Sequence, residues 1–240
     1  MINIIGFDTA TDTFGLGLSS GEKTYYLEIN GGPRHSQLIM DGAQTLLSMA
    51  ALHRGDLEAA ACMEGPGSFT GLRIGFAAAK GISLALGIPL IPIPTLDCMA
   101  ASLSFWPGMV VPLIDAKKNA FFTAPYFRGK PLGPCRDASV EELIAVIDSL
   151  ADSLGKDLFP GNNSGGNHAD KAQLPILLTG PAAPRVYSAL VVPFPQTRVD
   201  PAGERCHARE LLNLAKERSI LDTGDAELVY LRKSDAELNG

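Results

Sequence analysis

The chain has 240 residues, 46% of them hydrophobic, and a formal net charge of −6. That apolar share is ordinary for a soluble protein with a packed core, and the length fits one large domain or two small ones. Non-specific nucleic-acid binding depends on lysine and arginine at the phosphates. An acidic chain is therefore a poor general nucleic-acid binder, and contact with RNA requires a local basic patch or a basic partner.

The cysteines and the apolar runs indicate in which cellular compartment the protein works. The four cysteines form no CxxC pair, so we expect reduced thiols rather than a disulfide framework. The first residues lack a basic stretch followed by a long apolar core, so we expect no signal peptide. Residues 76–91 are apolar but are broken by Lys80 and Pro89, and we expect no membrane span there. These features favour a cytoplasmic protein.

In chain order, strands alternate with helices through the first hundred residues. Short apolar or alternating runs predict strands at residues 3–7, 14–18, 24–29, 59–63 and 89–93. Apolar residues at helical spacing predict helices at residues 36–52 and 70–86, and a short helix begins near residue 95.

The second half repeats this alternation more weakly. Strands are predicted at residues 109–114, 121–127, 175–178 and 191–194, and helices at residues 140–154 and 208–218. Residues 160–169 are rich in glycine and asparagine and predict a surface loop, and residues 228–231 form an apolar stretch in the tail.

Two strand–aspartate units open the two halves. At an offset of 107 positions Asp8 falls on Asp115 and Phe14 on Phe121, in each case an apolar strand, an aspartate, a polar turn and a second strand. This is what an internal duplication leaves behind. We therefore expect two α/β subdomains, residues 1–105 and 106–240, with the C-terminal helix packing back on the first.

The stretch EGPGSFTGLRIG, residues 64–75, predicts a strand, a tight glycine turn and a helix capped by Ser68 or Thr70. Such a turn is either a structural elbow or a phosphate site, and it matches neither common phosphate-binding pattern. The helix that follows carries small residues at helical spacing. Glycine inside a helix costs about 1 kcal/mol relative to alanine, so this ridge indicates close approach of another backbone, within the chain or from a partner. Its members are Gly71, Gly75, Ala78, Gly81 and Ala85.

Nearly the whole chain resembles the bacterial TsaB (YeaZ) family, which helps to make N6-threonylcarbamoyladenosine on tRNA. The resemblance rests on EGPGSFTGLRIG, on IIGFDTATDTFGLGL at the start, on PLIDAKKNAFF in the middle and on AELVYLRKSDAE at the end. It implies an actin-like ATPase (ASKHA, RNase H-like) fold, an α/β fold of two lobes with the second reduced.

The resemblance also implies a scaffold role and its partners. It implies a non-catalytic subunit that binds and activates a TsaD-like catalytic subunit, works with a TsaE-like ATPase and meets tRNA through the complex. The family pairs through its two first-lobe helices, here residues 36–52 and 70–86, and the same surface permits a homodimer. The interface residues that this implies are Ile39, Ala43, Leu46, Gly71, Gly75 and Ala78.

Nucleotide contacts follow from the resemblance too. It implies no cofactor in the isolated chain, ATP or ADP at the interface with the partner, and turns that face the nucleotide at Asp8, Thr9, Thr11 and Asp115. From the residues alone, each aspartate either faces phosphate or caps its own turn through an Asx-type hydrogen bond.

Catalytic and metal-binding groups are not expected. TsaD carries two metal-binding histidines at positions that correspond to Thr95 and Met99, and neither side chain replaces imidazole well as a ligand. Ser68 lies outside a GxSxG pattern. The alternative functions are an actin-like ATPase or small-molecule kinase and a glycoprotease-like peptidase. The first needs a glycine-rich adenosine loop, and Pro181 removes a backbone N–H from the turn at Gly180.

Overall fold

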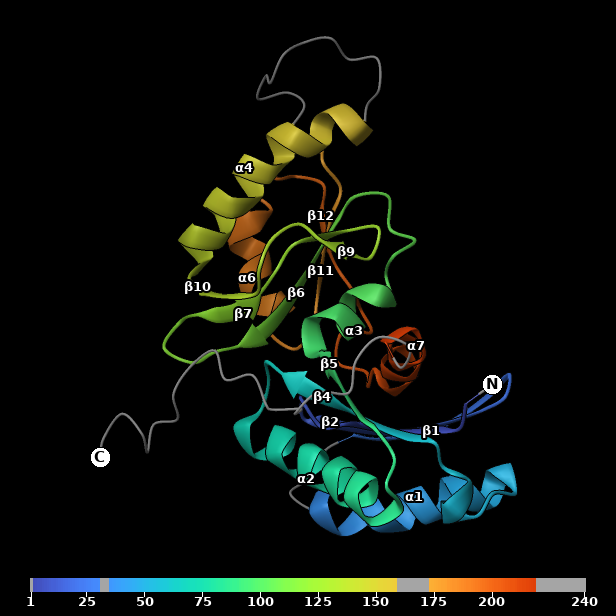
Figure 1. Ribbon diagram of the computed structural model, residues 1–240. Helices are drawn as coiled ribbons and strands as arrows, with labels where there is room; N and C mark the ends of the chain where they lie inside the picture. Colours follow the sequence, from blue (N-terminus) through green and yellow to red (C-terminus); the bar gives the residue numbers. More distant parts are fainter. Residues whose placement is uncertain (1, 31–34, 159–172, 219–240) are drawn as a thin grey trace. The chain divides into compact units, whose positions relative to one another are not determined.

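The computed structural model of the protein describes residues 2–30, 35–158 and 173–218. The chain divides into two compact units (Figure 1). Unit 1 comprises Met1–Cys98 together with Arg205–Gly240, and unit 2 comprises Met99–Glu204. The chain thus returns to unit 1 after completing unit 2.

Unit 1 is built on a five-stranded sheet in the order β3-β2-β1-β4-β5. Its first three strands form an antiparallel meander, and the last two run parallel to β1. The strands are β1 (Ile4–Asp8), β2 (Thr13–Ser20), β3 (Lys23–Asn30), β4 (Ala59–Gly65) and β5 (Leu90–Pro94).

Helices cover both faces of this sheet (Figure 1). On one face α1 (His35–Ala50) and α2 (Phe69–Leu86) pack on the strands and on each other. On the other face lies α7 (Ala208–Arg218), which contacts β1, β2 and the parallel strands. Because side chains alternate along a strand, Ile5 and Phe7 enter the core under α1 and α2, and Ile4 enters the core under α7.

Unit 2 repeats this plan, and apart from β6 its strands are shorter than those of unit 1. Its main strands run in the order β10-β7-β6-β11-β12, and β8 and β9 form a side hairpin on β6. The helices α4 and α6 pack against each other. Of the other described helices, η1 (Arg54–Asp56) belongs to unit 1, and α3 (Thr95–Ala101) begins in unit 1 and ends in unit 2. The elements are β6 (Met109–Asp115), β7 (Phe121–Thr123), β8 (Tyr126–Phe127), β9 (Lys130–Pro131), β10 (Arg136–Ala138), α4 (Val140–Leu158), β11 (Ile176–Thr179), α6 (Ala183–Leu190) and β12 (Thr197–Val199).

The two sheets share strand order and strand direction. In each, the strand that ends in the aspartate pairs antiparallel with the next strand and parallel with a later one. Asp8 pairs with Gly15, whereas Asp115 pairs with Phe121, so the hairpin of unit 2 is one residue shorter. The fixed offset of 107 positions therefore matches the aspartates but misses the second strand by one residue.

Two sequence predictions in unit 2 are wrong. Residues 191–194 form turns after α6, a helix that the sequence analysis did not predict, and the edge strand is β12. The single strand predicted at residues 121–127 is two strands separated by Pro125, because proline cannot donate to the ladder. The loop predicted at residues 160–169 and the apolar stretch at 228–231 lie outside the described residues.

Candidate functional site

The glycine turn after β4 is closed by the chain itself. Ser68 donates its backbone N–H to the Ala10 carbonyl at 2.8 Å, and its hydroxyl accepts from the Gly71 N–H at 3.2 Å. An added Cβ at Gly67 would lie 2.5 Å from the Ala10 oxygen. Ser68 is thus the predicted cap of α2. Two of the N–H groups that a phosphate needs are already bonded, which favours the structural elbow.

The glycine ridge of α2 begins inside unit 1. Gly71 and Gly75 are buried, and a Cβ added to either would collide with Thr9, at its carbonyl oxygen and its hydroxyl respectively. Thr9, predicted to face a nucleotide, is itself buried. These glycines therefore serve the approach of the β1–β2 turn, the intramolecular alternative left open by the sequence.

The other predicted interface residues are also internal. Ile39, Ala43 and Leu46 belong to the core under α1, and Ala78 is partly buried against the same core. Such packing is typical of a periodic apolar stripe, which marks the face that a helix turns to its own sheet. Whether the two helices bind a partner stays a prediction.

Both helices keep an exposed side that carries apolar residues, which we call the outer face. Leu84 is 75% exposed, Met40 58% and Met49 57%. An added Cβ at Gly81 would meet nothing within 4 Å. The outer face comprises Met40 and Met49 of α1 and Ala77, Gly81, Leu84 and Ala85 of α2.

The composition of α2 also resembles that of a membrane span. By length and hydropathy it is the one helix in the described ranges that is able to cross a bilayer, with 22% of its 18 residues buried. A single helix of this kind is weak evidence. Arg73 and Lys80 project from its exposed side, and the other side packs on the sheet.

Asp8 ends β1 as a buried carboxylate held by two backbone N–H groups. Its side chain is bonded to the N–H of Ala10, two residues on, at 3.4 Å, and to the N–H of His207 at 2.6 Å. The first contact is the Asx-type cap. The second comes from a residue 199 positions away, and no local sequence signal announces it.

Burial raises the pKa of Asp8 to about 6. The hydrogen bonds from His207 and Ala10 lower the pKa, but burial outweighs them, and the charges of Glu210 and Glu28 raise it further. Asp8 is thus a carboxyl group that titrates near neutral pH beside the N-terminus of α7.

Asp115, the counterpart in unit 2, is half-buried and lies beside two cationic side chains. Its carboxylate accepts from the Lys117 N–H at 2.9 Å, again an Asx-type contact, and forms ion pairs with Lys117 at 3.3 Å and Arg185 at 3.0 Å. Burial acts to raise the pKa of Asp115, but the Lys117 hydrogen bonds and the charges of Lys117 and Arg185 together lower it. Arg185 also lies over the Phe121 ring at 5.2 Å.

The remaining predicted site residues are not gathered around a reaction centre. Thr11 donates to the Thr13 carbonyl at 3.4 Å within its own turn. Thr95 and Met99, at the positions of the TsaD histidines, are buried. In the part of the chain that the structure describes, no cluster of three His, Cys, Asp or Glu side chains is placed to hold a metal ion.

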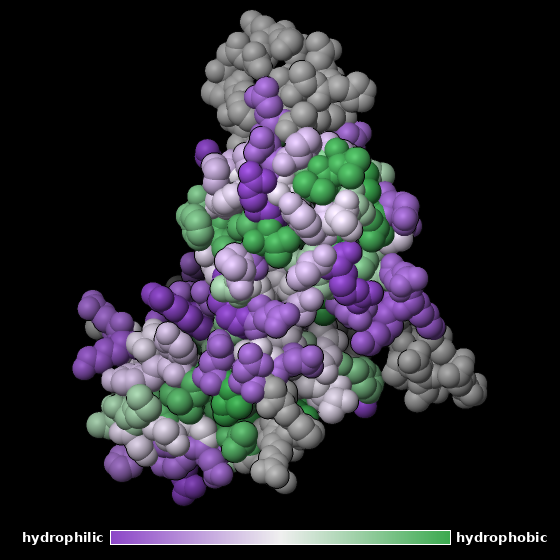
Figure 2. All heavy atoms as spheres, turned by 180° about the vertical axis from the view of Figure 1, so that it is seen from behind, coloured by the Kyte–Doolittle hydropathy of each residue, from purple (hydrophilic) through white to green (hydrophobic). Residues whose placement is uncertain are grey.

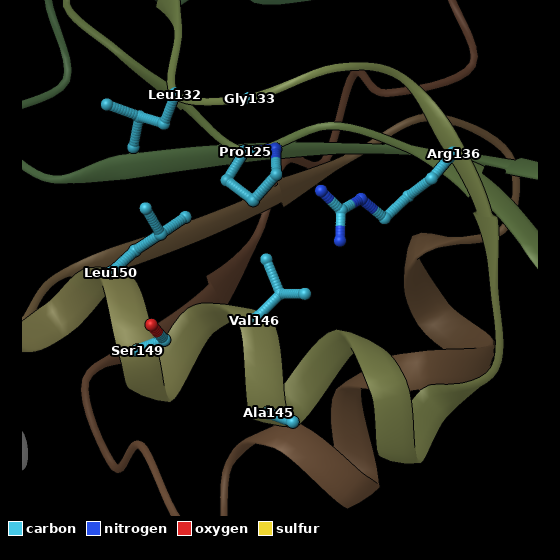
Figure 3. Close-up of a pocket in the computed structure, with 8 residues that line it drawn as sticks. All are labelled: Pro125, Leu132, Gly133, Arg136, Ala145, Val146, Ser149 and Leu150. Carbon is cyan, nitrogen blue, oxygen red and sulfur yellow. The ribbon is translucent and has the colours of Figure 1, made fainter.

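Two concave features of unit 2 offer little chemistry. The turn at Gly180 is filled, because an added Cβ at Gly203 would lie 2.8 Å from the Gly180 nitrogen. A hollow of about 330 Å³ lies between α4 and the segment around β9 and β10 (Figure 3). Its walls are mainly apolar, and its side-chain polar groups are the Arg136 guanidinium and the Ser149 hydroxyl. None of the sequence-predicted site residues lines it.

Comparison with known families identifies the class of protein. The family model described as "TsaD: tRNA N6-adenosine threonylcarbamoyltransferase" matches residues 30–189, more than half of the chain. The chain therefore belongs to this family, and relatives named TsaB support the resemblance to TsaB (YeaZ) proteins that its sequence motifs predicted.

Two TsaB proteins illustrate this relationship. The Bacillus subtilis protein named tRNA threonylcarbamoyladenosine biosynthesis protein TsaB is 31% identical over 130 residues, which are 52% of this chain and 55% of that protein. The Escherichia coli protein of the same name is 34% identical over 131 residues, 53% and 56% of the two chains. The matched region thus spans about half the length of these relatives.

Solved structures match the fold over nearly the full length. A Pseudomonas aeruginosa structure, described as an uncharacterized protein with similarity to peptidase YeaZ, covers 97% of this chain and 100% of its own at TM-score 0.73 and 21% identity. The structure described as YeaZ from Pseudomonas aeruginosa has TM-score 0.69, 20% identity and coverage of 96% and 100%. The predicted two-lobed, actin-like α/β fold is confirmed.

Proposed function

We propose that this chain is a non-catalytic scaffold subunit that binds a TsaD-like catalytic subunit and supports N6-threonylcarbamoylation of adenosine in tRNA. The observation that carries the proposal is the outer face of α1 and α2, which exposes apolar side chains beside Arg73 and Lys80 and leaves Gly81 open. The names of the TsaB relatives support the assignment to tRNA modification.

The outer face suits a helix from a partner. Ala77, Gly81 and Leu84 follow one another at spacings of four and three residues, so they form one stripe on α2. Two small residues beside an exposed leucine let a second helix approach toward the near end of the usual 8–10 Å packing distance. Hydrophobic residues lie on the surface of the helical layer at the lower end of Figure 2.

The described residues favour a supporting role over independent chemistry. Ser68 caps a helix, Asp8 is bonded to the backbone at His207, and Asp115 is paired with two cations. The proposal therefore places the transfer chemistry, any bound metal and the tRNA contact on the TsaD-like partner. It also places ATP or ADP at the interface of the complex, includes a TsaE-like ATPase, and assigns the complex to the cytoplasm. A homodimer through the outer face is proposed for the chain without its partner.

Reconstituted tRNA modification tests the proposal. The chain, a TsaD-like subunit and a TsaE-like ATPase are mixed with unmodified tRNA and a threonylcarbamoyl donor, and the modified nucleoside is measured by mass spectrometry. We expect no product from the chain alone and a large increase when it joins the partner. Product from the chain alone, or no dependence on the chain, would contradict the proposal.

A matched pair of glycine variants assigns the effect to the outer face. Gly81→Arg introduces a long charged side chain into the outer face, whereas Gly133→Arg does so in unit 2, where an added Cβ meets only the Arg136 guanidinium at 3.8 Å. We expect Gly81→Arg to lose stimulation by roughly tenfold or more and Gly133→Arg to keep it. Equal activity of the two variants would place the interface elsewhere.

A further inference from the structure

The face of the unit 1 sheet beneath α7 is lined with glycines. An added Cβ at Gly6 would lie 3.1 Å from Leu212, one at Gly17 would lie 2.7 Å from Leu212, and one at Gly15 would lie 2.7 Å from Cys206. On the helix side Leu211, Leu212 and Ala215 are fully buried. Because three strand positions are glycine, α7 and the residues before it can lie directly on the backbone of the sheet.

Carboxylates hold the N-terminal end of α7. Asp8 of β1 accepts from the His207 N–H at 2.6 Å, and Glu28 of β3 accepts from the Cys206 N–H at 2.8 Å. At the far end Arg218 donates to the Pro92 carbonyl at 3.0 Å and pairs with Asp97 at 3.8 Å. The helix is therefore fixed to unit 1 at both ends, and its first end depends on two acidic side chains.

We propose that α7 and the two residues before it act as a strap on unit 1, held tightly when Asp8 carries a proton and loosened when Asp8 ionises. When the strap lies on the sheet, Asp8 is 2% exposed. When it lifts, Asp8 meets water, where its charged form is well solvated. Ionisation thus favours the lifted strap, and proton uptake favours the docked one.

The surroundings of Asp8 set the direction of this dependence. The side chains that interact with its charge are acids and thiols: Glu28 on β3, Glu210 and Cys206 in the strap, and Cys98 on α3. From the strap backbone, the His207 N–H donates to it. Burial and the two glutamates raise the pKa of docked Asp8 to about 6, above its ordinary value of 3.8. The strap is therefore tightest below pH 4 and weakens as the pH rises through 6.

Hydrogen exchange of the segment 206–218 measures strap opening directly. The full chain is compared with Asp8→Asn, which keeps an oxygen acceptor for the His207 N–H and removes the charge. Rates are compared at equal pH, so the intrinsic pH dependence of exchange cancels. We expect the natural chain to exchange roughly tenfold faster or more than Asp8→Asn at about pH 8, and the ratio to approach one at about pH 4.

Three further variants keep the test decisive. Glu210→Gln removes a repulsive neighbour of Asp8 and is expected to slow exchange in the same direction by a smaller factor. Glu217→Gln, exposed at the far end of α7, is the charge control and should change nothing. Gly17→Leu blocks the seat and should open the strap at every pH. A ratio that does not vary with pH, or faster exchange in Asp8→Asn at about pH 8, would overturn the proposal.

This inference is independent of the proposed function. The strap and the outer face lie on opposite faces of the unit 1 sheet (Figure 1). Asp8→Asn should therefore slow strap exchange without abolishing binding of a TsaD-like subunit. Gly81→Arg should weaken that binding and leave strap exchange unchanged.

Discussion

The β1–β2 turn of unit 1 and the β6–β7 turn of unit 2 follow the same plan with opposite electrostatics. Each begins with an aspartate that ends a central strand and accepts from a backbone N–H two residues later. Asp8 is buried under the α7 strap, and its pKa is raised to about 6. Asp115 meets Lys117 and Arg185 in solvent, and its pKa is lowered.

The residue that pairs with each aspartate explains the difference. Gly15 pairs with Asp8 and leaves room for Cys206, whereas Phe121 pairs with Asp115 and fills the core of unit 2 with its own ring. A distant segment thus covers Asp8, whereas Phe121 packs into the core of unit 2 and the Asp115 side chain stays 32% exposed. The titration of an aspartate in this fold is set by what covers its turn.

The largest effect is expected from emptying the unit 2 turn. Phe121→Ala removes a ring that is 3% exposed and lies beneath Arg185. Large-to-small changes of this type cost about 3–5 kcal/mol. Denaturant unfolding followed by hydrogen exchange should show the loss in unit 2, with β1 and β2 still protected. A loss of less than about 1 kcal/mol would mean that the ring does not fill that turn as described.

The reciprocal change fills the unit 1 turn. Gly15→Phe places a Cβ 2.7 Å from the Cys206 Cβ, and the ring has no space beneath the strap. Overpacking typically costs about 1–3 kcal/mol, and we expect the upper end together with rapid exchange in residues 206–218. Gly133→Phe, at an open glycine, is the control. Normal protection of the strap in Gly15→Phe would contradict the glycine seat.

The two aspartates should respond differently to the same substitution. A folded-state pKa of about 6 against 3.8 means that ionised Asp8 lowers stability above pH 6, and that this cost disappears as the pH falls to 4. Asp8→Asn should therefore raise the unfolding free energy by about 1–3 kcal/mol at pH 8 and leave it unchanged at low pH.

Asp115→Asn should act in the opposite sense. The pKa of Asp115 is lowered, so its ionised form contributes stability above its ordinary pKa, and this contribution is lost as the pH falls. Melting curves of both variants from low to high pH test the contrast. If both substitutions changed the stability in the same direction at each pH, the two turns would not differ in electrostatics.

The smallest effect is expected at the exposed ion pair. Arg185 is 49% exposed in its side chain, so Arg185→Met should cost no more than about 1 kcal/mol, part of it from the contact with Phe121. The ionic share should disappear in high salt, which leaves the ring contact. A cost that does not change with salt would assign the whole effect to packing.

Local patterns predicted most elements but few contacts between distant segments. The helix at 208–218 has the predicted bounds because apolar spacing and a polar outer side agree. The turns at 191–194 were predicted as a strand because a short apolar run has no period that separates a strand from other structure.

The site was harder to predict than the fold. The aspartates and the small-residue ridge were found, since strand ends and helical spacing are local signals. Gly71 and Gly75 of α2 face Thr9, and the backbone N–H of His207 donates to Asp8. Neither contact could be predicted from residues that are near in the sequence. The glycines at 6, 15 and 17 were visible in the sequence, but only the close packing of α7 and Cys206 explains why these positions have no side chain.

Two glycines of one helix provide the most direct test of the scaffold assignment. Gly75 faces Thr9 inside unit 1, and Gly81 is open on the outer face. Binding of a TsaD-like subunit is measured by calorimetry for Gly75→Leu and Gly81→Leu, beside the melting temperature of each isolated chain. We expect Gly75→Leu to melt early, and Gly81→Leu to melt normally but bind roughly tenfold more weakly or worse. A folded Gly81→Leu chain with unchanged affinity would contradict the account.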